Sequence, residues 1–142
     1  MPEDWLAPEC FVCGPRTDGL RICPHHLPET EVWATVWIPD ESVSANGATV
    51  DPTSFGVLDC PAGIAVTQTG LAAPSFFAAL TNLTAQLKHP IHLGTPVAVY
   101  GWFIDEDERR INGGTVILAG DGTILATAYA QHAQLPLNFG SG

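Results

Sequence analysis

Alternation of apolar and polar residues predicts two short strands early in the chain, followed by one long helix. The segment EVWATVWI at residues 31–38 has the two-residue period of a strand, and LRICPHH at residues 20–26 precedes it as the first strand. Asp51 is placed to cap a helix whose first residue is Pro52. The pattern predicts that this helix runs for about 17 residues towards Gly70.

The second half of the chain predicts four more strands, joined as a meander. These strands are expected at residues 76–87, 94–104, 115–119 and 123–132, with a charged hairpin tip at residues 105–114 and a two-residue Asp121-Gly122 turn. An antiparallel sheet buries a single helix most economically by wrapping around it. The sequence therefore predicts an α+β fold with one domain, an antiparallel sheet wrapped around one long central helix.

The distribution of prolines, cysteines and acids divides the chain into three parts. Residues 1–19 are predicted to form an irregular arm that contains a Cys-x-x-Cys pair, residues 20–136 form the domain, and residues 137–142 form a tail. The N-terminus lacks the basic and apolar regions of a signal peptide, and no window has the length of a membrane span. We expect a cytoplasmic protein with reduced cysteines.

The composition restricts the kinds of partner. Of the 142 residues, 46 % are hydrophobic and only 14 % are charged, so part of the surface is expected to be contact surface in a homodimer or a dimer of dimers. The formal net charge of −10 argues against a nucleic-acid partner and against an anionic membrane surface. Any anionic ligand would need a local basic patch.

Asp59 is the one formal charge between Asp51 and Lys88, and it lies within an apolar run of the predicted helix. An ionised side chain in such surroundings is costly unless it is paired or hydrogen-bonded. Two interpretations stay open. Asp59 acts on a substrate or a water molecule, or it accepts hydrogen bonds that fix a dimer.

The cysteines offer a second candidate chemistry. Cys10, Cys13, Cys23 and either His25 or His26 form a candidate zinc set, in which Cys-x-x-Cys spacing suits tetrahedral ligation. Pro24 constrains the second half of this set on a predicted strand, and a single Cys-x-x-Cys is a weak signal. We therefore expect an apolar tucked arm with neither metal nor cofactor, and Cys60 as a small core residue rather than a nucleophile.

Two motifs and the predicted strand order resemble the hotdog acyl-CoA thioesterase superfamily. The segment CFVCGPRTDGLRI at residues 10–22 is similar to the Cys-Phe-x-Cys-Gly opening of many small hotdog proteins, although Thr17 and Asp18 stand where Asn-Pro is common. GVLDCPAGIA at residues 56–65 is similar to a Leu-Asp-Cys-Pro-x-Gly helix segment of actinobacterial hotdog proteins. The resemblance implies a hotdog domain that hydrolyses an acyl thioester.

The resemblance also implies roles for individual residues. Asp59 falls where thioesterases similar to the phenylacetate-pathway enzyme carry a helix acid, as catalytic base or water-orienting group, and Gly47 matches the glycine of the loop before the helix. The family's His-Gly-Gly at the helix start is here Val50, Asp51 and Pro52, and Pro52 has no N–H to polarise a carbonyl. The expected substrate-binding residues are Gly47, Thr53 or Ser54 as oxyanion donor, and Lys88, Arg109 and Arg110 for coenzyme A phosphates.

The helix start leaves a second function open. Without the glycine amides, the protein would be a non-catalytic hotdog shell that binds an acyl group or another apolar small molecule. A zinc-stabilised structural protein is the third class that the sequence allows.

Overall fold

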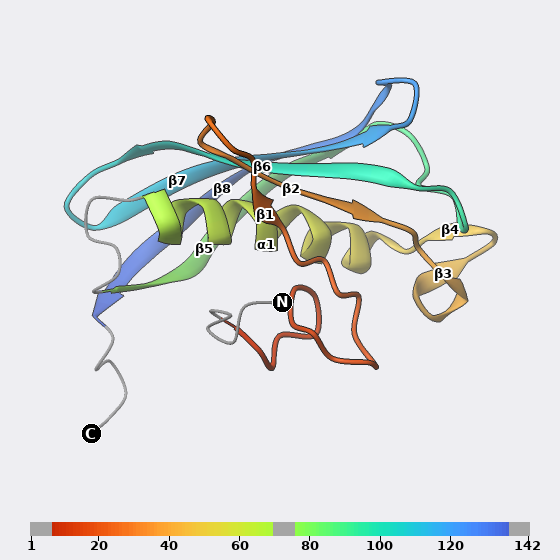
Figure 1. The fold of residues 1–142 in the computed structure, drawn as a ribbon, viewed down its shortest axis with the longest axis horizontal. Coiled ribbons are helices and arrows are strands. Elements are labelled where there is room, and N and C mark those ends of the chain that lie inside the picture. Colours follow the sequence, from red (N-terminus) through yellow and green to blue (C-terminus); the bar gives the residue numbers. More distant parts are fainter. Residues whose placement is uncertain (1–6, 70–75, 137–142) are drawn as a thin grey trace.

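One long helix lies against the concave face of a six-stranded antiparallel sheet (Figure 1). The computed structural model describes residues 7–69 and 76–136. The sheet has the strand order β1-β2-β6-β7-β8-β5, and β3 and β4 form a separate two-stranded hairpin. The elements are β1 (His25–His26), β2 (Val32–Trp37), the 3₁₀ turn η1 (Glu41–Val43), β3 (Ser44–Ala45), β4 (Ala48–Thr49), α1 (Asp51–Thr69), β5 (Phe76–Leu87), β6 (Val97–Glu106), β7 (Arg110–Ala119) and β8 (Ile124–Pro136).

This architecture confirms the predicted fold class, one helix enclosed by an antiparallel sheet. Helix α1 begins one residue earlier than predicted, because Asp51 is its first residue rather than its cap. A turn does form at Asp121-Gly122, where Gly122 has a φ of +87° and its N–H donates to the Ala119 carbonyl at 2.9 Å. The predicted two-residue length is wrong, because β7 ends at Ala119 and β8 begins at Ile124, which leaves residues 120–123 between the strands. The predicted tail at residues 137–142 lies outside the described residues.

The predicted strand at residues 20–26 is wrong for most of its length, because only His25 and His26 belong to β1. The N–H groups of Leu20 and Ile22 donate to the Phe11 and Val12 carbonyls, so this segment pairs with the arm instead of the sheet. Arg21 has a φ of +54°, which interrupts an extended strand.

The charged tip predicted at residues 105–114 is also wrong, because β7 already begins at Arg110. The glycines that suggested a turn are needed for packing. A Cβ on Gly113 would lie 2.9 Å from Val66 Cγ1, and a Cβ on Gly114 would lie 2.5 Å from the Trp102 ring. Glycine at position 113 therefore lets the helix pack closely, and glycine at position 114 leaves space for the Trp102 side chain of the neighbouring strand.

Helix α1 forms in spite of a poor helical sequence, since Pro61 lies inside it. Burial compensates, because Val57, Leu58, Ala62, Ala65 and Val66 are fully buried. The backbones of the helix and the sheet approach each other closely at Gly101, where a Cβ would lie 2.4 Å from the Pro61 carbonyl carbon and oxygen. No helix in the described part of the chain is both long and apolar enough to cross a membrane.

The arm lies on the face of α1 that points away from the sheet (Figure 1). Val12 and Leu20 pack against the main core cluster. Gly56 allows this approach, because a Cβ there would lie 3.0 Å from Val12 Cγ2. The helix is therefore covered on one side by the sheet and on the other by the arm.

Candidate active site

Asp59 has a polar partner that the sequence did not suggest. Its Oδ1 lies 3.4 Å from Nε2 of His132, which comes from β8 on the sheet beneath the helix. This contact is longer than an ordinary N–H···O hydrogen bond of about 2.9 Å. It leaves most of the carboxylate's acceptor capacity for another group.

The two side chains differ in exposure. The Asp59 side chain is 32 % exposed, whereas that of His132 is 2 % exposed. Among the described residues, no partner is found for the buried His132 Nδ1. Gly63 lies next to the ring, since a Cβ there would be in van der Waals contact with His132 Nε2 at 3.4 Å. The arrangement is a solvent-accessible carboxylate held beside a buried imidazole.

A pattern in β8 contained the signal for His132. Ala126, Ala130 and His132 are separated by even numbers of residues, so their side chains lie on the same face of the strand, the one that faces the helix. The two alanines are fully buried or nearly so. Small side chains on this face let α1 approach the sheet. His132 lies on the same inward-facing side of the strand as these alanines. The sequence pattern therefore marks it as a candidate partner for Asp59 on the helix.

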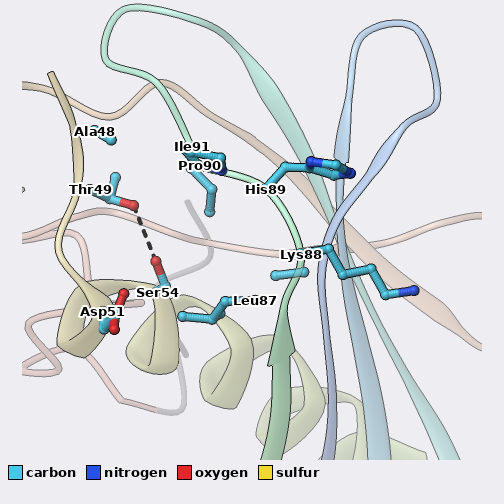
Figure 2. Close-up of a pocket in the computed structure, with 10 residues that line it drawn as sticks. Ala48, Thr49, Asp51, Ser54, Leu87, Lys88, His89, Pro90 and Ile91 are labelled. Carbon is cyan, nitrogen blue, oxygen red and sulfur yellow. Dashed lines mark hydrogen bonds between the residues drawn. The ribbon is translucent and has the colours of Figure 1, made fainter.

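A cleft of about 350 Å³ lies at the start of α1 (Figure 2). Asp51 and Ser54 from the first turn of α1 face Thr49, and the Thr49 and Ser54 hydroxyl oxygens are 3.1 Å apart. Lys88 and His89, from the segment after β5, belong to the opposite side. The other residues that line the cleft are Ala48, Leu87, Pro90, Ile91 and Ala126.

The cleft contains two of the residues expected to bind substrate, Ser54 and Lys88. Gly47 lies beside it in the turn between β3 and β4, where Asn46 and Gly47 have φ values of +54° and +78°. The Asn-Gly pair is a hairpin signal in the sequence that our strand prediction did not use. Thr53 is not among the residues that line the cleft.

The backbone amides expected as oxyanion donors already have an acceptor. The N–H groups of Thr53 and Ser54 donate to the Val50 carbonyl at 3.1 and 3.2 Å. The Ser54 hydroxyl lines the cleft, and it can donate to a ligand when the Thr49 hydroxyl is the donor in the hydrogen bond that the two share.

The structure does not bring the predicted basic residues together within one chain. Lys88 follows Leu87, which pairs with Ala126, whereas Arg110 pairs with Ala133 opposite Ala79. Ala79 and Leu87 are roughly 26 Å apart along β5 at about 3.3 Å per residue. The single basic patch would therefore require a second subunit.

The cysteines are arranged differently from the predicted zinc set. Cys10 and Cys13 lie near Cys60 of α1, whereas the Cys23 thiol donates to the Cys13 carbonyl at 3.1 Å, and His25 is exposed on β1. The hydrogen bond to Cys13 and burial raise the pKa of the Cys60 thiol above its ordinary value. A protonated thiol is a poor nucleophile.

Comparison with known proteins relates the chain to solved structures alone. No protein-family model matches the sequence, and no curated protein matches it. A thioesterase superfamily protein of known crystal structure has a TM-score of 0.77 and 17 % identity over 88 % of this chain, which covers 63 % of that protein's length.

Two further structures support the same fold. A Streptococcus mutans protein bound to acetyl CoA has a TM-score of 0.65 and 12 % identity, with 76 % of this chain and 84 % of that chain covered. The E. coli PaaI protein from the phenylacetic acid degradation operon has a TM-score of 0.65 and 8 % identity, with 74 % and 73 % covered. The chain therefore has the hotdog fold of thioesterase-superfamily structures, a single helix enclosed by an antiparallel sheet.

Proposed function

We propose that the protein hydrolyses an acyl thioester of coenzyme A or of a carrier protein, with Asp59 as the general base. The observation that carries this proposal is the Asp59 carboxylate, partly exposed in the middle of α1 and beside His132 at 3.4 Å. A hydrolytic site needs a carboxylate that water can reach and that the protein holds in place. The acetyl-CoA-bound structure with the same fold supports the substrate class.

The chemistry follows from the carboxylate and the cleft. Asp59 takes a proton from water as the water oxygen attacks the thioester carbonyl carbon, and the Ser54 hydroxyl stabilises the developing oxyanion. The carbon–sulfur bond then breaks, and the leaving thiolate recovers the proton from Asp59. Asp59 is not among the residues that line the cleft, and it lies roughly 7.5 Å beyond Ser54 along the helix axis, so this mechanism requires the thioester carbonyl to lie between the two side chains.

A homodimer is part of this proposal. In the described part of the chain, β5 pairs with β8 on one side only, which leaves a long strand edge available for pairing. Antiparallel pairing of two β5 edges would place Lys88 near Arg109 and Arg110 of the partner subunit. This composite basic patch would bind the phosphates of coenzyme A in a cytoplasmic enzyme.

Replacement of one carboxylate tests the mechanism. Asp59→Asn keeps the side-chain shape but removes the base, so turnover of a panel of acyl-CoA thioesters should fall by about 10²–10⁴-fold, measured as thiol release. The same chemical change at exposed Glu31, Glu31→Gln, is the matched control and should leave turnover unchanged. A fully active Asp59→Asn protein would rule out the mechanism.

A specific observation favours a second candidate function. Pro52 has no N–H, and the Thr53 and Ser54 amides already donate to Val50, so the helix start offers few backbone donors for an oxyanion. The protein would then bind an acyl or other apolar ligand without turning it over. Saturable binding of an acyl-CoA to the wild-type protein, without thiol release from any member of the panel, would identify this function.

A further inference from the structure

Three cysteine thiols meet between the arm and the helix, outside the cleft. The sulfur atoms of Cys10, Cys13 and Cys60 all lie within 4.8 Å of one another, and those of Cys10 and Cys60 are 3.8 Å apart. Two of these residues belong to the arm and one to α1. The four cysteines all lie within the described residues and are not joined in disulfides.

The spacing of the sulfurs suits a tetrahedral metal ion. Two thiolates that bind Zn²⁺ at about 2.3 Å with tetrahedral angles are about 3.8 Å apart. The Cys10–Cys60 separation of 3.8 Å already has this value. A disulfide requires a sulfur–sulfur distance of about 2.05 Å, so it would need these atoms to move much closer.

The backbone around Cys10 forms a tight turn that keeps the two sulfurs of the Cys-x-x-Cys pair close together. The Cys13 N–H donates to Cys10 Sγ at 3.4 Å, as in a turn that closes on its first cysteine. The Gly14 N–H donates to the Cys10 carbonyl at 2.9 Å and closes the turn. A Cβ on Gly14 would lie 2.5 Å from the carbonyl oxygens of Cys10 and Pro8, so this tight turn requires glycine after the second cysteine.

We propose that Cys10, Cys13 and Cys60 bind one Zn²⁺ ion, which fastens the arm to α1. Each thiol releases its proton to solvent as its sulfur binds the ion. Water would complete the tetrahedron, because the Cys23 thiol donates to the Cys13 carbonyl and stays outside the set. This set replaces the one predicted from sequence, which contained Cys23 and His25 in place of Cys60.

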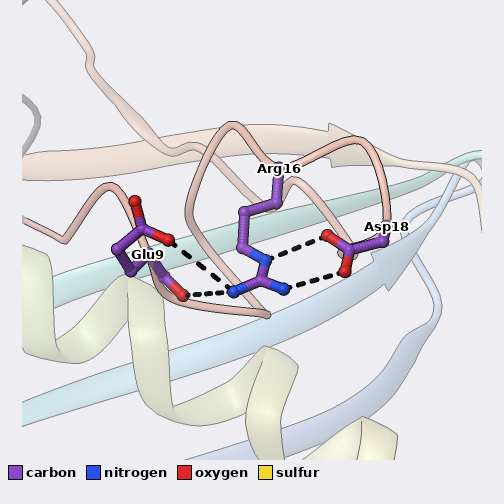
Figure 3. A network of polar contacts seen from close by, with 3 residues as sticks. All are labelled: Glu9, Arg16 and Asp18. Carbon is purple, nitrogen blue, oxygen red and sulfur yellow. Dashed lines mark hydrogen bonds and ion pairs between the residues drawn. The ribbon is translucent and has the colours of Figure 1, made fainter.

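The other contacts of the arm show what the ion would add. Arg16 donates to both carboxylate oxygens of Asp18 at 2.9 and 2.8 Å and to the Glu9 carbonyl at 3.3 Å (Figure 3). These contacts are exposed and lie within the arm itself, so they do not tie it to the helix. The arm is otherwise held by the packing of Val12 and by the hydrogen bonds that Leu20 and Ile22 donate to it, so a metal bridge to Cys60 would add a direct attachment to α1.

Metal binding by the reduced full-length protein tests the proposal. Titration with Co²⁺ should produce thiolate-to-metal charge-transfer absorption that saturates at one ion per chain, and Zn²⁺ should displace it. Zn²⁺ should also raise the melting temperature and slow tryptic cleavage after Arg16. Absence of the charge-transfer absorption in the folded, reduced wild-type protein would overturn the proposal.

Serine variants identify the ligands. Cys60→Ser should weaken Co²⁺ binding at least tenfold, whereas Cys23→Ser, a change of the same kind at a buried cysteine outside the set, should retain it. Cys10→Ser, at a partly exposed position, should show the same loss and serves if Cys60→Ser does not fold. Equal loss in Cys23→Ser and Cys60→Ser would overturn the three-cysteine assignment. Because the readout is metal binding, an inactive protein that binds Co²⁺ would refute only the proposed hydrolase.

Discussion

At the scale of single residues, the structure explains why one carboxylate is tolerated in an apolar segment. Asp59 is not sealed in the core, because its side chain is 32 % exposed and lies beside His132. Its neighbours Val57 and Leu58 are fully buried. The cost of burying an unpaired charge is therefore largely avoided, and the carboxylate remains accessible for chemistry.

A glycine sets how closely the helix that carries Asp59 approaches the sheet. In Gly101→Ala, the added Cβ would lie 2.4 Å from the Pro61 carbonyl, so α1 or β6 must shift. We expect the free energy of unfolding to fall by about 1–3 kcal/mol, measured by denaturant titration. Gly120→Ala, where a Cβ would meet nothing within 4 Å, is the control and should change stability by less than about 0.5 kcal/mol. Equal stability of the two variants would contradict this view of the contact.

At the scale of elements, short polar contacts fix the turns between the long strands. Asp107 accepts hydrogen bonds from the N–H groups of Arg109 and Arg110 at 2.8 and 2.9 Å in the β6–β7 hairpin. Asp121 accepts one from Thr123 N–H in the next hairpin. Aspartate at these positions replaces backbone acceptors that a tight turn does not provide.

The β6–β7 hairpin should depend on pH through Asp107. The two backbone N–H groups lower the pKa of its carboxyl below the usual value, so the charged form is favoured in the folded hairpin. The resulting stabilisation is present above the pKa of an unfolded aspartate and is lost as the pH falls through the lower folded value. Nuclear magnetic resonance should show the Arg109 and Arg110 amide signals titrating at a pH below that of a free aspartate, and Asp107→Asn should abolish this titration. Amide signals that titrate at the ordinary aspartate pH would contradict the assignment.

At the scale of the whole molecule, the layers are the sheet, the helix and the arm (Figure 1). The core between sheet and helix is apolar. Strand β5 forms one edge of the sheet, and no other described strand pairs with its outer side. Exposed strand edges favour pairing with another chain. The proposed dimer would cover this edge and complete the basic patch.

The mass in solution tests this assembly. Light scattering at micromolar concentration should give twice the chain mass of 15.0 kDa. Thr84→Lys places like charges on two facing β5 edges and should raise the concentration at which the dimer dissociates. Thr95→Lys, the same change at an exposed position outside the strands, should not. A wild-type monomer would exclude the composite patch.

Local patterns in the sequence were sufficient for the order of the main elements. Alternation predicted β2 and β5, the Asp121-Gly122 pair marked the turn before β8, and the Asp51-Pro52 pair located the start of α1 to within one residue. These signals arise from neighbouring residues, since strand period, capping and two-residue turns depend on the backbone nearby. Asp59 was identified for the same reason, because an isolated charge in an apolar run is visible without a fold.

Tertiary structure alone decided which distant residues meet. His132 reaches Asp59 and Cys60 joins the Cys-x-x-Cys pair only because β8 and the arm pack on opposite sides of α1. Gly113 and Gly114 read as a turn in the sequence, but they belong to β7, since the space for a side chain is taken by Val66 and Trp102. Such contacts depend on packing between segments far apart in the chain, and local propensity carries no information about that packing.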